Sequence, residues 1–171
     1  MSRSVKMVSV AAKAVTFRRA LATGSLKMGR AAFELLAAGR LPKGDALKLG
    51  EIAGIMAAKR TSETIPLCHP LSLDQVECWF ELDRSLPGAR GFCRASAEAK
   101  TGVEMEALCG VSAALLAVYD LVKPVDPALL IGDIHLVRKE GGKSGTWTFP
   151  PKTNRKEKTP LQPSGRASVI T

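Results

Sequence analysis

Hydrophobic positions along the chain switch between a helical and a strand-like spacing. Residues 29–41, GRAAFELLAAGRL, place apolar side chains three and four positions apart, and Gly39 is expected to end this helix. Residues 45–65 repeat the helical spacing, with Asp45 as the expected N-cap. In residues 73–82, LDQVECWFEL, every second residue from the valine onward is apolar, which predicts a half-buried strand.

A hairpin and the longest helix follow. Residues 89–99, ARGFCRASAEA, alternate in the same way, and the turn SLPGAR that leads into them predicts a hairpin. Residues 101–124 predict a long helix, in which Thr101 and Glu104 fit a capping box and Pro124 ends the last turn. The middle of this helix is apolar or small all round, so we expect a central buried element.

The order of these segments predicts the fold class. With residues 18–28, RRALATGSLKM, as the first strand and residues 131–140, IGDIHLVRKE, as the last, the order is β-α-α-β-β-α-β. The simplest arrangement is an antiparallel sheet with helices packed on one face. We therefore expect an α+β, ferredoxin-like fold with one extra helix.

The composition is that of one globular domain with a basic tail. The 171 residues are 46% hydrophobic and carry a formal charge of +9, which provides enough apolar material for a single core. Residues 1–149 are expected to form this domain. Residues 150–171 are Pro-rich, basic and without periodicity, and are expected to be disordered. No apolar run has the length of a membrane-spanning helix, so we expect a soluble, cytoplasmic protein.

The amino-terminal stretch leaves two interpretations open. No acidic residue precedes Glu34, and Arg, Lys and Ser are frequent, as in an organelle transit peptide. The segment VTFRRALATG within it can equally be an ordered basic strand.

Cysteine and histidine usage argues against a structural metal site. The four cysteines, at positions 68, 78, 93 and 109, are spaced too widely for a Cys-x-x-Cys ribbon. The only histidines are His69 and His135. We therefore predict no metal ligands and no disulfide framework.

Two polar stretches around the middle of the chain are candidates for chemistry. In IPLCHP, two prolines hold Cys68 and His69 in a stiff extended segment. Neighbours in extended backbone point to opposite faces, so a catalytic Cys-His dyad is disfavoured and Cys68 is better explained as a small buried side chain. In KTGVEMEALC, the capping box explains Glu104 but not Glu106, and Lys100 with the free amides of the helix start makes an anion site possible.

The third candidate stretch is YDLVKP, at the other end of the long helix. Asp120 and Lys123 are three positions apart, so they share a helix face and can pair. Such a pair is either a solvated surface contact or, at the end of an apolar helix, an acid/base pair in a partly desolvated pocket, and both interpretations stay open. Glu106 precedes Asp120 by 14 positions, roughly 21 Å along a helix. The two ends therefore line different sites, or one site is shared between subunits, and we hypothesise an oligomer.

Five motifs together resemble a known family. In order and spacing, KGDAL, IAGIMAAKRTSETIPLCHPL, KTGVEMEAL, YDLVK and GGKSG are similar to the MoaC-type cyclic pyranopterin monophosphate synthases of molybdenum cofactor biosynthesis, from about Met7 to Gly145. The resemblance implies a ferredoxin-like fold and hexamers built as trimers of dimers, with active sites at the dimer interfaces. It implies a lyase that rearranges 3′,8-cyclo-7,8-dihydroguanosine 5′-triphosphate, made by a radical-SAM GTP cyclase, to cyclic pyranopterin monophosphate and releases pyrophosphate.

The resemblance also implies roles for individual residues. Asp120 and Lys123 match the catalytic pair of the family, and we expect them to carry out proton transfers. Cations among the binding residues are expected to stabilise the departing pyrophosphate. No cofactor is required, and Mg²⁺ bound to the triphosphate of the substrate is compatible with the reaction. The positions implied to bind substrate are Arg18, Lys43, Lys59, Leu67, Cys68, His69, Glu104, Met105, Glu106 and Lys143.

The sequence departs from the family pattern in places. Ser9 stands where Asp is usual, Pro124 where Ala is usual, and Cys109 and Leu116 where Thr is common. Pro124 bears most on the site, because it can end the helix early and move the neighbouring lysine.

Two rival functions stay open. An inactive family member kept as an assembly partner would bind ligand without turnover. A nucleic-acid-binding module would use the same basic ferredoxin-like sheet, although the strand aromatics Trp79, Phe80 and Phe92 form no RNA-recognition motif.

Overall fold

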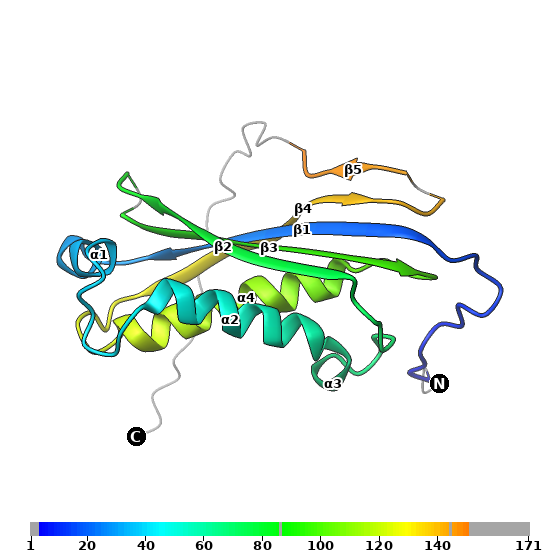
Figure 1. Ribbon diagram of the computed structural model, residues 1–171, viewed down its shortest axis with the longest axis horizontal. Coiled ribbons are helices and arrows are strands. Elements are labelled where there is room, and N and C mark those ends of the chain that lie inside the picture. The colour runs from blue at the N-terminus through cyan, green and yellow to red at the C-terminus, as the bar shows by residue number, and fades with distance from the viewer. Residues whose placement is uncertain (1–3, 86, 144, 151–171) are drawn as a thin grey trace, which may run out of the picture.

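The chain folds into two layers, a sheet and a pair of helices on one of its faces (Figure 1). The computed structural model describes residues 4–85, 87–143 and 145–150. The strands are β1 (Thr16–Lys27), β2 (Gln75–Asp83), β3 (Gly88–Ala99), β4 (Leu130–Glu140) and β5 (Trp147–Thr148). The helices are α1 (Arg30–Ala37), α2 (Ala46–Lys59), α3 (Thr61–Thr64) and α4 (Glu104–Val122).

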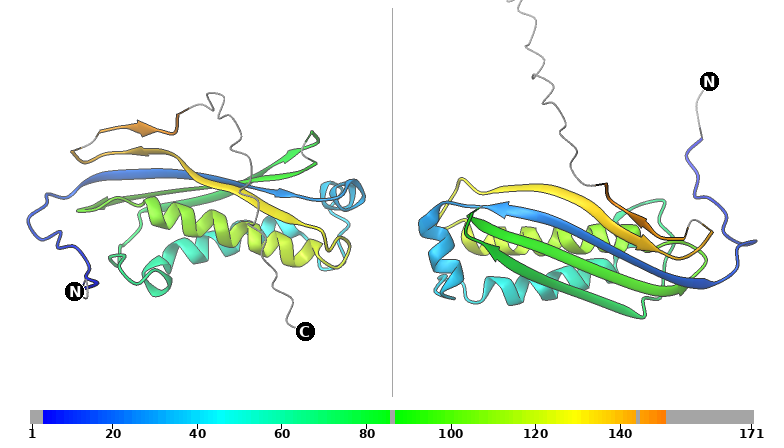
Figure 2. Two further views of the ribbon diagram at one scale, coloured as in Figure 1. Left: turned by 180° about the vertical axis from the view of Figure 1, so that it is seen from behind. Right: turned by 90° about the horizontal axis from the view of Figure 1, so that it is seen from above.

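The strand order confirms the predicted α+β, ferredoxin-like class. The sheet runs β2-β3-β1-β4-β5, and each neighbouring pair is antiparallel. Figure 2 shows the strands side by side from above, with α2 and α4 beneath them. The Thr16–Lys27 strand confirms that VTFRRALATG is ordered as a basic strand. The predicted disordered tail lies outside the described residues, apart from Pro150.

Two local features differ from the prediction, and one local prediction is confirmed. The helix predicted over 45–65 is two helices, because Arg60 leaves the helical region with φ −117° and ψ 21°. The short strand β5, which pairs with Arg138 and Lys139, was not predicted, since two residues carry no periodicity. The expected N-cap is confirmed: Asp45 Oδ1 accepts from the Lys48 amide at 3.0 Å.

The predicted capping box at the start of α4 is wrong. The N-cap is Val103, and its side chain makes no capping hydrogen bond. Glu104 instead accepts a hydrogen bond from Lys139 Nζ at 3.0 Å. The Glu104 carboxylate therefore pairs with a cation on β4, where both groups are charged, and not with the local capping amide.

Small side chains let the helices lie close to the sheet. The helix-facing positions of β1 and β3 are largely alanines, and Ala20, Ala22 and Ala95 are at most 1% exposed. Gly54 of α2 and Gly110 of α4 meet above them. A Cβ built on Gly54 would lie 2.9 Å from the carbonyl oxygen of Gly110, closer than two helices bearing larger residues can approach.

The expectation that α4 is buried on all sides is wrong within one chain. Val111, Leu115 and Val118 are fully buried against the sheet, but Leu116 is 60% exposed on the outer side. The outer side is open because no described element covers the helix layer (Figure 1). In the described part of the chain, α4 alone has the length and apolar composition of a membrane span. The expectation that no apolar run is this long is therefore wrong, and the packed inner side of α4 explains its length and composition as those of a core helix.

Candidate active site

A pocket of about 220 Å³ opens at the N-terminal end of α4. It forms where the turn after α3 approaches the start of α4. The turn is closed by a hydrogen bond from the Cys68 amide to the Ile65 carbonyl at 3.0 Å, so the backbone between the two prolines is not extended throughout. Six predicted binding residues line this pocket: Leu67, Cys68, His69, Glu104, Met105 and Glu106.

Burial sets the protonation of two groups in this pocket. Glu106 is 4% exposed, and burial raises the pKa of its carboxyl, with Glu104 adding to the effect and the residue's own backbone amide opposing it. Burial also raises the pKa of the Cys68 thiol, with help from Glu106 and Cys109. A thiol with a raised pKa is a poor nucleophile, in agreement with the prediction that Cys68 is not one.

A second, smaller hollow continues from this pocket toward the sheet edge. Glu104 lines both, and here it faces Arg18 and Lys139. The Arg18 Nε donates to the carbonyl oxygen of Ala99 at 3.4 Å. Gly142, with φ +67°, lies against the Arg18 guanidinium where a side chain would collide with it. This glycine turn therefore leaves room for the Arg18 guanidinium in the hollow.

Lys139 is a site residue that the sequence analysis missed. Its neighbours Arg138 and Glu140 point to the open face of the sheet and pair with each other, so alternation places Lys139 on the helix side. A cation at a position that should face the core was the available signal.

A cluster of three charged side chains lies at the other end of α4. Lys43 Nζ donates to Asp120 Oδ2 at 2.9 Å and to the Asp120 carbonyl oxygen at 3.2 Å. Lys123 Nζ approaches Asp120 Oδ1 at 2.7 Å. The predicted Asp120–Lys123 pair is thus present, and it gains Lys43 from the loop before α2. All three side chains are roughly half exposed, so within one chain the cluster is a surface contact and not an enclosed pocket.

The two lysines control the charge of the aspartate. Hydrogen bonds from Lys123 and Lys43 lower the pKa of Asp120 to about 2, and Asp120 in turn raises the pKa of Lys123. Pro124 does not displace the lysine, contrary to our concern from the sequence. Lys123 keeps helical dihedrals and its amide donates to the Tyr119 carbonyl at 2.9 Å, so its side chain still reaches Asp120.

Two predicted residues lie away from both clusters. Lys59 ends α2 and lines another hollow with Asp74, and this hollow shares only Leu71 with the pocket at the start of α4. Lys143 is exposed beyond the Gly141-Gly142 turn. Within the described ranges, no group of three or more His, Cys, Asp or Glu side chains is arranged to hold a metal ion.

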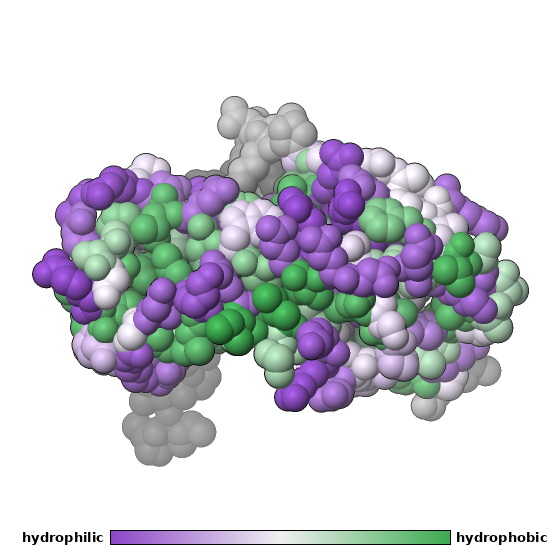
Figure 3. All heavy atoms as spheres, in the orientation of Figure 1, coloured by the Kyte–Doolittle hydropathy of each residue, from purple (hydrophilic) through white to green (hydrophobic). Residues whose placement is uncertain are grey.

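The two clusters stand at opposite ends of one helix layer with an exposed apolar surface on it. We call this surface the outer helix face; it consists of Leu49, Ile52 and Met56 of α2 and Leu116 of α4, all of them exposed. Figure 3 shows apolar side chains (green) gathered along the helix layer between hydrophilic groups. Such a surface is typical of a contact with another protein chain.

The fold and these two clusters define a class: a ferredoxin-like α+β protein with sites of carboxylate and cationic side chains suited to an anionic ligand. The MoaC family model matches residues 7–142, and the chain belongs to the MoaC family. It is 48% identical over 143 residues to a cyclic pyranopterin monophosphate synthase of Clostridium perfringens (strain 13 / Type A), covering 84% of this chain and 90% of that protein. A protein of the same name from Novosphingobium aromaticivorans is 48% identical over 144 residues, with the same coverage.

Proposed function

We propose that this chain is a cyclic pyranopterin monophosphate synthase of molybdenum cofactor biosynthesis. It converts 3′,8-cyclo-7,8-dihydroguanosine 5′-triphosphate to cyclic pyranopterin monophosphate and releases pyrophosphate, which makes it a lyase of the phosphorus–oxygen class. The observation that carries this function is the membership of the chain in the MoaC family, together with the gathering of its motif residues at the two ends of α4.

The phosphoryl step needs cations and a proton acceptor. A substrate hydroxyl oxygen forms a bond to the α-phosphorus, the bond from this phosphorus to the α,β-bridging oxygen breaks, and pyrophosphate leaves with the electron pair. Fixed cations stabilise the charge that develops on the leaving group. Arg18 and Lys139 at one end of α4, and Lys43 at the other, are cations placed next to the clusters.

Proton transfers are assigned to Asp120 and Lys123. In the open surface cluster Asp120 is a weak base, because two lysines hold its pKa at about 2. Enclosure of the cluster would remove water, which raises the pKa of a carboxyl and lowers that of a lysine. Both changes bring the pair toward the range in which the two groups can exchange protons with a substrate.

A second copy of the chain can supply that enclosure. The two clusters lie at opposite ends of α4, so a two-fold axis across the middle of the helix sets the Asp120 cluster of one chain against the Glu106 pocket of the other. The apolar outer helix face lies between the two clusters and provides the contact surface for such a dimer. We therefore place the active site between two chains of a dimer, and three dimers in a hexamer as the family resemblance implies.

The remaining parts of the proposal concern what acts with the enzyme. The substrate is supplied by a radical-SAM GTP cyclase in the cytoplasm, and the enzyme needs no resident cofactor. Any Mg²⁺ that takes part in the reaction is bound to the triphosphate of the substrate and enters the active site with it.

The test is turnover of the cyclic triphosphate by the purified protein. Wild type is expected to release pyrophosphate and form cyclic pyranopterin monophosphate, detected by phosphate assay after pyrophosphatase and by chromatography. Asp120→Ala and Lys123→Ala are expected to lose activity at least about a hundredfold while they remain folded. Asp126→Ala, a neighbouring aspartate that binds the Gly29 amide at 2.6 Å instead, is the control for folding. Ligand binding without turnover by wild type would favour the inactive assembly partner.

A further inference from the structure

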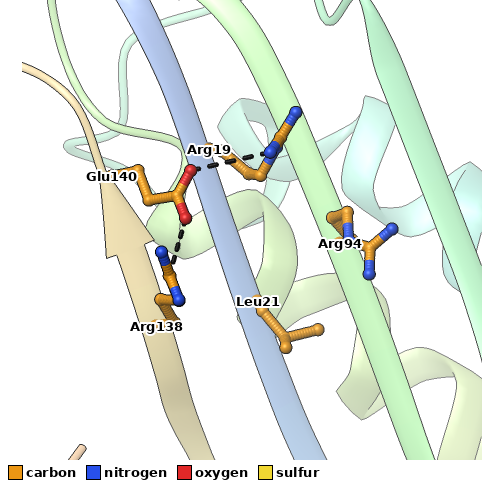
Figure 4. A pocket seen from close by; sticks show the side chains of 5 residues that line it. All are labelled: Arg19, Leu21, Arg94, Arg138 and Glu140. Atoms are coloured by element: carbon orange, nitrogen blue, oxygen red, sulfur yellow. Dashed lines mark ion pairs between the residues drawn. The ribbon is translucent and has the colours of Figure 1, made fainter. Parts of the chain in front are cut away.

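A second cationic hollow lies on the sheet face that α2 and α4 leave uncovered. Its volume is about 360 Å³, and Arg19 and Leu21 of β1, Arg94 of β3, and Arg138 and Glu140 of β4 line it (Figure 4). Strand register explains the arrangement, since Leu21 pairs with Arg94 on one side and with Arg138 on the other. These two arginines therefore stand on either side of Leu21, about 10 Å apart at the backbone.

Contacts within the sheet hold the three arginines in place. Glu140 pairs with Arg138 at 2.6 Å and with Arg19 at 3.6 Å. Arg94 pairs with Glu77 at 3.0 Å and lies over the Trp79 ring. A carboxylate engages at most part of the five-donor guanidinium fork. Three guanidiniums are thus paired with two carboxylates, Glu77 and Glu140, so one positive charge and several hydrogen-bond donors remain in excess there.

The nearby aromatic side chains do not offer a platform for a nucleobase. Trp79 and Phe92 stack on each other with centroids 5.1 Å apart and planes 9° apart, and the Arg94 guanidinium sits 5.2 Å from the Trp79 centroid. Base recognition on such a sheet requires aromatic faces free for stacking. The hollow is therefore suited to a compact anion and not to single-stranded RNA.

The arginine hollow is connected to the candidate active site through shared side chains. Arg19 and Glu140 also line the small hollow that contains Arg18 and Lys139. Glu104 in turn belongs to both that hollow and the pocket at the start of α4. Cationic side chains thus continue from the open face of the sheet to the pocket.

We propose that the hollow formed by Arg19, Arg94 and Arg138 is an accessory site for a pyrophosphate-class anion, which receives the diphosphate after its release from the active site. The three guanidiniums that line the hollow supply positive charge and hydrogen-bond donors for the several oxygens of such an anion. The inference rests on the proposed function, because the reaction proposed for this chain supplies pyrophosphate.

The test is calorimetric titration of the full-length protein with inorganic pyrophosphate. Wild type is expected to show two classes of site, one in the active site and one in the arginine hollow. The double variant Arg94→Gln/Arg138→Gln is expected to lose the second class or to bind there roughly tenfold more weakly for each arginine removed. Arg84→Gln is the matched control, because Arg84 is an exposed guanidinium paired with Glu34 outside the hollow. In nuclear magnetic resonance spectra, the side-chain Nε signals of Arg94 and Arg138 are expected to shift during the titration.

Three results would overturn the inference. The first is a double variant that binds pyrophosphate with unchanged affinity and stoichiometry. The second is a wild type with a single class of site. The last is a double variant whose oligomeric state changes while its pyrophosphate binding does not. The last would make the arginines subunit contacts. Failure of the proposed function is read separately: if wild type does not turn over the cyclic triphosphate, the pyrophosphate titration still reports on the hollow.

Discussion

Glu106 is a buried carboxyl in the candidate site, and its burial lowers the free energy of unfolding when the group is charged. It is 4% exposed, and the pKa of its carboxyl is raised by burial and by Glu104. A carboxyl whose pKa is higher in the folded than in the unfolded chain binds more protons when folded. The free energy of unfolding then falls as the pH rises from the unfolded pKa through the folded one, and it stays lower above that window.

We predict that Glu106→Gln removes this pH dependence. The amide has the same shape and no charge to bury, so the variant should be more stable than wild type above the folded pKa of Glu106. The difference should shrink as the pH falls and disappear below about pH 4, where the carboxyl is protonated in both states. Thermal unfolding midpoints between about pH 4 and pH 8 measure this. Glu81→Gln, at an exposed position of β2, is the control, and an equal response of both variants would contradict the prediction.

Sequence motifs identified the residues of the pocket at the start of α4 more completely than they identified the long-range contacts of Asp120 and Glu104. Cys68, His69 and Glu106 could be assigned from the resemblance because each stands in a contiguous motif. The contact between Lys43 and Asp120 joins residues 77 positions apart, and no local pattern encodes which lysine reaches the aspartate. Lys139 was missed for a related reason, since its role depends on the register that sets it beside Glu104.

At the scale of elements, the approach of α2 to α4 depends on two glycines. The Cβ of a residue at position 54 would meet the Gly110 carbonyl oxygen at 2.9 Å and the Cys78 sulfur at 2.7 Å. Both helices are anchored on the sheet, so the backbone oxygen has little room to move. Gly54 therefore serves close packing, although glycine weakens a helix interior.

We predict that Gly54→Ala destabilises the protein by about 1–3 kcal/mol, through overpacking at the helix crossing. Intrinsic helix propensity alone predicts the opposite, a gain of up to about 1 kcal/mol. Urea unfolding monitored by circular dichroism distinguishes the two. Lys48→Ala, at an exposed position of the same helix, should change stability by less than about 0.5 kcal/mol. A Gly54→Ala variant as stable as wild type would show that the crossing can relax.

Helices and strands were predicted correctly where the hydrophobic pattern extends over many residues. The prediction failed where a partner far away in the sequence determines the local structure. The three long strands after β1 and the helix α4 have patterns of nine or more residues, and their types were predicted correctly. The capping box failed because the Glu104 carboxylate pairs with Lys139 of β4 and not with the local capping amide. The two-residue strand β5 exists only through its pairing with β4, which no sequence of that length can signal.

For the whole molecule, the division of the site between the two ends of α4 is the feature that shapes the proposed function. Asp120 and Lys123 are ion-paired on an open surface, whereas His69 and Glu106 line a pocket at the far end. A single chain cannot bring these ends to one small substrate, because an α-helix does not bend back on itself. The dimer proposed above would solve this, and contact through the outer helix face would also bury Leu116 and Ile52, whose exposure is unfavourable in an isolated chain.

We predict that two inactive variants restore activity when they are mixed, provided that their mutations lie at opposite ends of α4. Co-expressed Asp120→Ala and His69→Ala chains should recover about a quarter of the wild-type turnover, because half of the dimers are mixed and each of these holds one intact site of two. Mixed Asp120→Ala and Lys123→Ala chains are the control. Both mutations fall in the same cluster, so every site in that mixture lacks one member. Turnover of the cyclic triphosphate measures both mixtures. Recovery in neither mixture would place the whole site within one chain, and equal recovery in both would show that Asp120 and Lys123 do not act in the same site.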